Sequence, residues 1–220
     1  MKKLFCIILS IILLVSLCGC FGNKADDVRG TISNGGGDEL DPEFSLGKTS
    51  GGTYSNDFLG LSCTLPTGWE FYTDKQILEL NNIAGEYMDE DVAERLKNAA
   101  IVYDMAANHP ADGSNININM EKLSPSQLAT LNIQKTLESQ FDTIKSTFKN
   151  MGFTDINLKY QKVTVDGTEF DGVVLSAKTQ GVAFYETIFT FRKSNYLANI
   201  TVCSVGTDNT AALLDCFSVK

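Results

Sequence analysis

The sequence lacks most of the residues from which metal and catalytic sites are built. It has a single histidine, His109, and its six cysteines include no Cys-x-x-Cys pair. A multi-histidine or clustered-cysteine metal site is therefore not expected. The sequence also has no Gly-x-Gly-x-x-Gly or phosphate loop and no Gly-x-Ser-x-Gly elbow, the motifs that position phosphates and nucleophilic serines. These absences argue against the common enzyme classes.

Positive charge is scarce as well. The chain has 18 Lys and Arg against 27 Asp and Glu, a net charge of -9, which becomes −11 when Lys2 and Lys3 of the leader are left out. Such an acidic surface repels phosphate backbones and anionic lipids, so we expect no nucleic-acid partner and no adhesion to membranes by charge. The rest of the composition, 43% apolar and 20% charged, is typical of a soluble globular domain.

The N-terminus has the pattern of a secretory leader. Lys2 and Lys3 precede a mainly apolar run from Leu4 to Leu17. This run has the length of the apolar part of a signal peptide and is shorter than the about 20 residues that span a bilayer. We therefore interpret residues 1–19 as a signal peptide rather than a transmembrane anchor.

The leader ends in Leu17-Cys18-Gly19-Cys20, which resembles the lipobox of bacterial lipoproteins. The resemblance implies that Cys20 carries diacylglycerol and becomes the mature N-terminus, with no other cofactor. The alternative is a plain signal peptide with incidental cysteines. Two or three acyl chains give durable anchoring, so the protein is expected at the cell membrane, on its extracellular or periplasmic side.

Residues 20–51 are predicted to be the lipidated cysteine and a flexible tether. Seven glycines lie between Phe21 and Gly51, three of them consecutive, and large apolar residues are few. Such a segment cannot bury enough surface to fold. As a Gly-rich coil of about 30 residues it reaches on the order of 30 Å, which holds the folded part away from the membrane.

Residues 52–220 are predicted to form one globular domain. Alternating apolar residues predict strands over 59–65, 100–107 and 115–121, and the capping patterns at Thr73 and Ser124 predict helix starts. A short helix is expected from about Asp89. A long helix is expected from Pro125 to Met151, because apolar residues recur there three or four apart.

The C-terminal part is predicted to be an antiparallel meander. Asp166-Gly167 and Thr179-Gln180-Gly181 are hairpin signals, and a change of phase near Lys162 suggests a bulge. The run 182–191 is apolar on both faces, as expected for a central strand covered on both sides. A strand over 196–205 follows, and a last helix is expected to bury Leu213, Cys216 and Phe217. The pattern predicts an α+β three-layer sandwich around a mainly antiparallel sheet.

The start of this domain resembles that of many small bacterial lipoproteins, and together with the element order it resembles the PsbP-like sandwich. The matching residues are Tyr54-Ser55-Asn56-Asp57, Leu59-Gly60-Leu61, Leu65-Pro66 and Gly68-Trp69-Glu70. The resemblance implies a non-enzymatic adaptor that binds another protein. It transfers no functional residue, since Gly68 and Trp69 are interpreted as turn and core positions.

Three cysteines, Cys63, Cys203 and Cys216, remain after the leader and Cys20. A Cys203 to Cys216 disulfide is one prediction, because a strand end and the following helix would bring them together in a compartment that permits disulfides. The alternative is three buried thiols acting as small apolar residues.

Other polar groups have weaker claims. His109 is interpreted as a solvated loop residue, since a general base paired with Asp112 would need a serine that no motif supplies. The acidic groups at 89–91 and 166–171 lack the spacing of a calcium loop. Asn115, Asn117 and Asn119 alternate on one strand and are weak candidates for binding a sugar or an extended peptide, or they simply form its solvent-facing side.

The expected function is that of a lipid-anchored envelope lipoprotein acting as a non-enzymatic accessory module. Its partners are expected to be the membrane, through the lipid, and another envelope protein. The alternative is a lipoprotein that binds a small ligand, a sugar or a peptide, for a transporter, although about 170 residues are few for a two-lobed clamp. The sequence leaves the oligomeric state and the number of membranes open.

Overall fold

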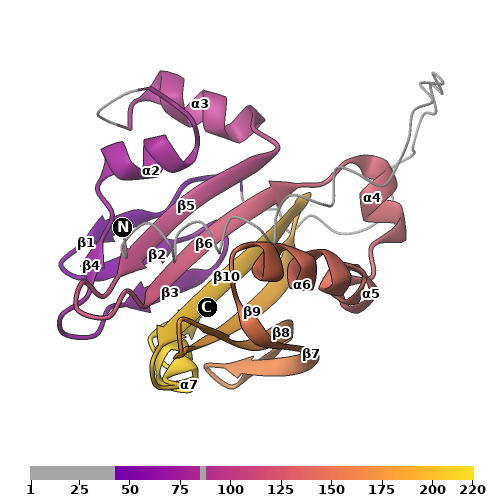
Figure 1. The fold of residues 1–220 in the computed structure, drawn as a ribbon. Helices are drawn as coiled ribbons and strands as arrows, with labels where there is room; N and C mark the ends of the chain where they lie inside the picture. Colours follow the sequence, from indigo (N-terminus) through magenta and orange to yellow (C-terminus); the bar gives the residue numbers. More distant parts are fainter. Residues whose placement is uncertain (1–42, 85–87) are drawn as a thin grey trace.

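The computed structural model describes residues 43–84 and 88–220. The predicted signal peptide, the lipobox and Cys20 lie outside these residues. The described chain forms a large and a small sheet with helices along the large one (Figure 1). Within the described residues, no helix is both long enough and apolar enough to cross a bilayer.

The large sheet has seven strands, and all of its strand pairs are antiparallel. In spatial order these are β4 (Glu70–Phe71), β5 (Ile101–Asn108), β6 (Asn115–Lys122), β10 (Tyr196–Val205), β9 (Val182–Lys193), β8 (Thr168–Thr179) and β7 (Thr154–Val165). The predicted hairpin at Asp166-Gly167 joins β7 to β8, and the one near Gly181 joins β8 to β9. The α+β class and the mainly antiparallel sheet are thus confirmed.

The small sheet was not predicted from the sequence. It consists of β1 (Lys48–Ser50), β2 (Thr53–Asn56), β3 (Leu61–Thr64) and β11 (Phe217–Val219), and β11 pairs with β3. Phe217 therefore lies in a strand, and the last helix, α7 (Thr210–Leu214), ends before it. Because β1 pairs with β2, the folded part begins inside the range predicted as tether.

The predicted helix starts are confirmed, but the long helix is not. Thr73 and Ser124 each form a capping box, at the starts of α2 (Asp74–Leu80) and α4 (Pro125–Thr130). The range 125–151 holds three helices, because α5 (Ile133–Ser139) and α6 (Phe141–Asn150) start anew. Asn132 causes the first break: its side chain accepts a hydrogen bond from Lys135 N and caps α5.

Two apolar cores lie on opposite faces of the large sheet, because successive residues of a strand point to opposite sides. One core packs the large sheet against the small sheet, α7 and the helix α3 (Glu90–Asn98). The other packs β7, β8 and β9 against α5 and α6. Figure 1 shows α2 and α3 near β5, and α5 and α6 on the other flank.

The predicted bulge near Lys162 is wrong. The pairing of β7 with β8 is continuous from Asn157 to Val165, and its register shifts between Thr154 and Asn157 instead. Leu158 belongs to the core beneath the helices, whereas Val163 and Val165 belong to the core beneath the small sheet. The change of phase therefore marks the point along one regular strand at which the covered face changes.

Candidate functional site

The three asparagines singled out in the sequence do not face solvent. Asn115, Asn117 and Asn119 are 4%, 5% and 1% exposed, so the interpretation of this row as a solvent-facing side is wrong. Polar groups are rarely buried in such number without partners or a role. Their surroundings are therefore the strongest candidate for a functional site.

The register places further polar side chains beside them. In the antiparallel sheet, Asn119 lies opposite Tyr103 of β5 and Asn199 of β10, and Asn117 lies opposite Thr201. Residues directly opposite each other share one face of a sheet. We call this set the polar face: Tyr103, Asn115, Asn117, Asn119, Glu121, Glu186, Thr190, Asn199 and Thr201.

Part of the polar face forms an internal hydrogen-bond ladder. Thr190 Oγ1 donates to Asn199 Oδ1 at 2.9 Å, and Asn199 Nδ2 donates to Asn119 Oδ1 at 3.3 Å. This ladder joins β9, β10 and β6 across the centre of the sheet. A longer contact of 3.5 Å runs from Asn117 Nδ2 to Asn115 Oδ1. The ladder fixes the asparagine side chains and so keeps the remaining polar atoms in place.

Three polar atoms of the face are buried and unpartnered in the part of the chain that the structure describes. They are the hydroxyl of Tyr103, Oδ1 of Asn117 and Oε2 of Glu121. An unsatisfied buried polar group costs about 1–3 kcal/mol. Burial also raises the pKa of the Glu121 carboxyl to about 7, because the ionised form loses hydration. A ligand that supplied hydrogen bonds here would offset these costs.

Of the members of the polar face, all except Asn199 are buried. On the sheet face that carries it, α5 and α6 pack against β7 and β8, whereas α3 packs in the core on the opposite face. A cavity of about 10 Å³ is lined by Tyr72, Leu80, Tyr103, Asn117 and others. A cavity of this size holds about one water molecule, so it has room for one small polar group.

Two members of the polar face, Glu121 and Glu186, were not predicted as site residues, although the sequence contains a signal for each. Glu121 follows the asparagines at the same spacing, and Glu186 is the one acidic residue in the doubly covered run 182–191. A carboxylate in such a run is unusual, since buried charges are rare. No sequence pattern, however, indicated that Tyr103 would lie opposite Asn119.

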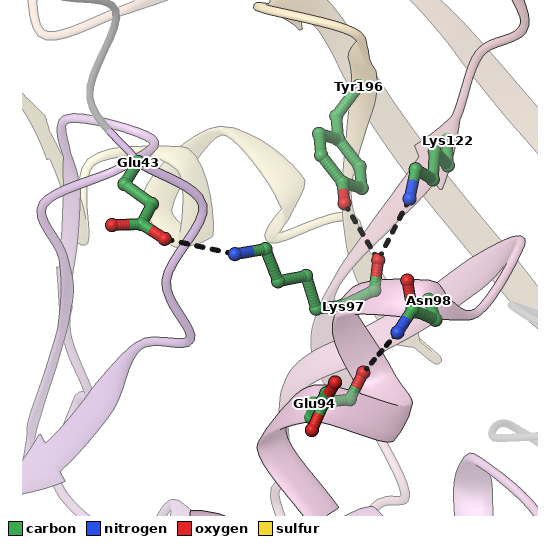
Figure 2. A network of polar contacts seen from close by, with 6 residues as sticks. All are labelled: Glu43, Glu94, Lys97, Asn98, Lys122 and Tyr196. Carbon is green, nitrogen blue, oxygen red and sulfur yellow. Dashed lines mark hydrogen bonds and ion pairs between the residues drawn. The ribbon is translucent and has the colours of Figure 1, made fainter.

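A second candidate surface is a hollow beside the first described residues. It measures about 300 Å³ and lies between Phe44, Lys97, Asn98 and the strands that carry Lys122 and Tyr196. Figure 2 shows the Lys97 carbonyl accepting hydrogen bonds from Tyr196 Oη at 3.2 Å and Lys122 Nζ at 3.1 Å. These contacts satisfy the C-terminal end of α3.

The same hollow also ties residue 43 to α3. Lys97 Nζ contacts Glu43 Oε1 at 3.0 Å, and Asn98 Nδ2 donates to the Glu94 carbonyl at 3.1 Å (Figure 2). The pKa of Glu43 is lowered by the hydrogen bond and the charge of Lys97. These polar groups of the hollow are thus paired with one another. Paired groups stabilise the fold and leave no hydrogen bond for a ligand to supply, so the hollow is the weaker candidate for a functional site.

The other predicted site residues do not converge. His109 lies in the loop between β5 and β6, where its Nδ1 is 3.1 Å from Asp112 Oδ2 and its ring lies 5.8 Å from that of Trp69. Within residues 43–84 and 88–220, no cluster of three or more His, Cys, Asp or Glu could hold a metal ion.

The predicted Cys203 to Cys216 disulfide is not formed. Within the described residues, Cys63, Cys203 and Cys216 form no disulfide with one another. Cys203 lies in the core beneath α5 and α6, whereas Cys216 packs against the core beneath the small sheet. The strand end and the helix approach each other as expected, but the two side chains point to opposite sides of the large sheet. The alternative of three buried thiols holds for Cys63 and Cys203, whereas Cys216 is only partly buried.

Comparisons with known proteins find a likeness of fold only. No family model and no curated protein matches the sequence. Among solved structures, the fold is similar to the solution structure of cyanobacterial PsbP (CyanoP) from Synechocystis sp. PCC 6803. The TM-score is 0.43 and the identity 12%, over 84% of this chain and 98% of that one. The PsbP-like sandwich was the expected fold, and this neighbour is a PsbP protein.

Proposed function

We propose that this chain is an envelope lipoprotein, anchored to the cell membrane by diacylglycerol on Cys20 and facing the extracellular or periplasmic side. The support is the order of features in the sequence: basic start, apolar run, small residue and cysteine. The Gly-rich residues before Glu43 then serve as the tether between the lipid and the folded domain.

The anchor is tested by two cysteine variants. In cells of the source organism, Cys20→Ala abolishes the lipid-modified N-terminal peptide in mass spectrometry and moves the protein out of the detergent phase. Cys18→Ser is the matched control, since a small residue at this lipobox position leaves lipidation intact. Unchanged lipidation of the Cys20→Ala variant would refute the anchor.

The folded domain acts, in this proposal, as a non-enzymatic accessory module that binds another envelope protein. The observation that carries it is the polar face, with its buried and unpartnered oxygens on Tyr103, Asn117 and Glu121. Groups of this kind recognise a partner that supplies the missing hydrogen bonds, and they reject partners that do not.

Binding of a small ligand is the second candidate. The row of amides on β6 favours it, because amides offer both donors and acceptors to a sugar or a peptide. The cavity at the face, however, measures about 10 Å³, whereas pockets for small molecules usually measure about 300–1,000 Å³. The cavity is therefore too small for a whole sugar or peptide.

The binding role is tested by crosslinking in intact cells and mass spectrometry of the joined proteins. A specific envelope protein should be recovered with the parent chain and lost with Asn117→Ala. Asn157→Ala, at an exposed position of β7, is the matched control and should retain the partner. Recovery of the same partner with Asn117→Ala would show that the polar face is not the binding surface.

A further inference from the structure

The first described residues, Glu43 to Gly47, lie against the domain without secondary structure of their own. We call these five residues the strap. Phe44 and Leu46 are partly buried and pack against the core beneath the small sheet, whereas Glu43 and Ser45 are exposed. The strap pairs with no strand of the described chain, so it is held by contacts with side chains of the domain, as a bound peptide is.

Phe44 fills an aromatic slot. Its ring stacks on that of Tyr196 with centroids 4.7 Å apart, and it meets the ring of Phe58 at 5.5 Å and 60°. Aromatic pairs at these separations attract each other. Tyr196 and Phe58 are 3% and 1% exposed, so they form the walls of the slot, and Phe44 is its partly exposed occupant.

The acidic side chain at the start of the strap meets a lysine. Lys97 Nζ of α3 is 3.0 Å from Glu43 Oε1 (Figure 2). The two side chains are 48% and 85% exposed, and an ion pair in contact with water adds little stability. The pair therefore favours an acidic residue before the aromatic one, and this end of the strap can lift from the domain at small cost.

The rest of the strap is recognised through its backbone. The Ser45 carbonyl accepts from Asn56 Nδ2 at 3.2 Å, and the Gly47 N–H donates to Asp104 Oδ1 at 2.9 Å. A Cβ atom at position 47 would overlap the Tyr54 ring. The position of Ser45 thus accepts any side chain, whereas the position of Gly47 accepts glycine. Asp104 loses a donor when the strap leaves, so a replacement has to supply an equivalent N–H.

The space around the strap is larger than the strap itself. Two open hollows border it, of about 430 Å³ and about 300 Å³, and Phe44 and Lys97 line both. Sites for ligands usually measure about 300–1,000 Å³. Because the polar groups here are paired with the strap, a ligand can use them only by taking its place, and the hollows give such a ligand room to enter.

We propose that the strap occupies a peptide-binding groove and is displaced from it by a partner protein. The groove is lined by Phe58, Lys97, Asp104 and Tyr196. Its ligand is an extended segment of the partner with the pattern of the strap: an acidic residue, an aromatic residue, any residue, an apolar residue and glycine. The strap competes within the same chain, so a partner binds only to the fraction of molecules in which the strap has lifted.

The groove is a second surface, separate from the polar face. Phe44 packs against the core that contains Ile118 of β6. Ile118 and its neighbour Asn117 point to opposite sides of the large sheet. The inference therefore goes beyond the proposed function, and a negative result in the crosslinking test with Asn117→Ala leaves it standing.

The test asks whether a strap peptide binds once the strap of the chain is weakened. The probe is Glu-Phe-Ser-Leu-Gly-amide with a fluorescent dye on its N-terminus, and its anisotropy is followed as the full chain is added in detergent micelles. Phe44→Ala should bind the probe saturably and about tenfold or more tightly than the parent, because the parent strap competes. Phe170→Ala, which removes another partly buried phenylalanine of the same core, is the matched control and should bind no better than the parent.

Altered probes decide which features are recognised. Replacing the Phe of the probe by Ala should lower its affinity about tenfold or more, and replacing its Gly by Ala should abolish binding. Adding Lys97→Ala to Phe44→Ala should weaken binding and reduce its dependence on salt. Circular dichroism shows in each variant that the domain is folded.

Three results would overturn the proposal: no saturable binding by Phe44→Ala, equal affinity of the parent and Phe44→Ala, or equal binding of the probe that lacks Phe. Light scattering distinguishes the remaining occupant. A parent chain that is dimeric and becomes monomeric in Phe44→Ala would overturn the assignment to a partner protein, because the strap of a second copy would then fill the groove.

Discussion

The Tyr54 hydroxyl donates a hydrogen bond of 2.5 Å to Asp104 Oδ2, which joins the small sheet to an irregularity in β5. Asp104 also accepts from Asn56 Nδ2 at 2.7 Å and from Gly47 N at 2.9 Å. Burial raises the pKa of Asp104, and the hydrogen bonds from Tyr54, Asn56 and Gly47 lower it only in part. One carboxyl thus fastens both β2 and the segment before β1 to the large sheet.

Removing the Tyr54 hydroxyl is expected to weaken this junction. Tyr54→Phe keeps the ring in the core and leaves Asp104 with one donor fewer, so the free energy of unfolding should fall by about 1.5–3 kcal/mol. Urea denaturation followed by circular dichroism measures it. Tyr185→Phe, at a partly buried position of β9, should change it by less than about 0.5 kcal/mol. Equal effects of the two variants would contradict the assigned role of the hydrogen bond.

Glu121 is expected to make stability depend on pH. Burial raises its pKa from 4.5 to about 7 in the folded state. The native state therefore binds more protons than the unfolded chain between these values, and the free energy of unfolding falls as pH rises from 4.5 to 7. Glu121→Gln should flatten this part of the profile and be the more stable form at pH 8, by on the order of 1–3 kcal/mol.

The groups around Glu121 are few and mostly uncharged, which makes the measurement simple. Tyr103 and Asn119 flank it on the polar face, Leu197 lies opposite it on β10, and Arg192 lies beyond Leu197 on β9. Urea titrations from pH 4 to 8 should give the same profile for the parent and for Glu169→Gln. A profile that Glu121→Gln leaves unchanged would mean that Glu121 ionises as an exposed residue does.

Gly172 marks a close approach between β8 and its neighbours. A Cβ atom there would lie 2.4 Å from Val163 Cγ2 and 2.5 Å from the Ile188 carbonyl oxygen. Gly172→Ala should therefore destabilise the domain by about 1–3 kcal/mol, the usual cost of overpacking. Adding Val163→Ala relieves the first contact and not the second, so it should not restore stability in thermal melts. Full recovery of stability in the double variant would show that only the Val163 side chain, and not the Ile188 carbonyl, opposes a Cβ atom at position 172.

The three thiols are expected to react in a definite order. Burial raises the pKa of Cys63 to about 12, so at pH 8 almost none of it is thiolate, the reactive form. Cys203 is fully buried, whereas Cys216 is partly exposed. Iodoacetamide labelling read by peptide mass spectrometry should modify Cys216 first and all three in guanidinium. Recovery of a disulfide-linked peptide containing Cys203 and Cys216 from the unreduced protein would contradict this result and support the predicted disulfide.

Local patterns predicted the elements well, because local chemistry decides them. The capping boxes at Thr73 and Ser124 need only neighbouring residues, and the turn at Asp166 needs only the positive φ that Asp166 and Gly167 adopt. The spacing of apolar residues likewise located β9 and its two covered faces. The break at Asn132 was missed because the helical spacing of apolar residues continues on both sides of it, and this spacing was given more weight than the capping potential of one asparagine.

Which faces of the strands are covered by other elements could not be predicted in the same way. The alternation in β6 indicates which residues share a face, but not which face is buried, so Asn117 was expected at the surface and is 5% exposed. The small sheet was missed because β2, β3 and β11 are each four residues or fewer, and their pairing joins distant parts of the chain. Phe217 was assigned to the preceding helix for that reason.

The pairing of β3 with β11 also determines when the domain can be completed. β3 ends at Thr64 and β11 begins at Phe217, and the Lys220 N–H donates to the Gly60 carbonyl at 2.9 Å. The small sheet is therefore complete only when residues 217–219 have paired with residues 61–63, and contacts this far apart in sequence form slowly.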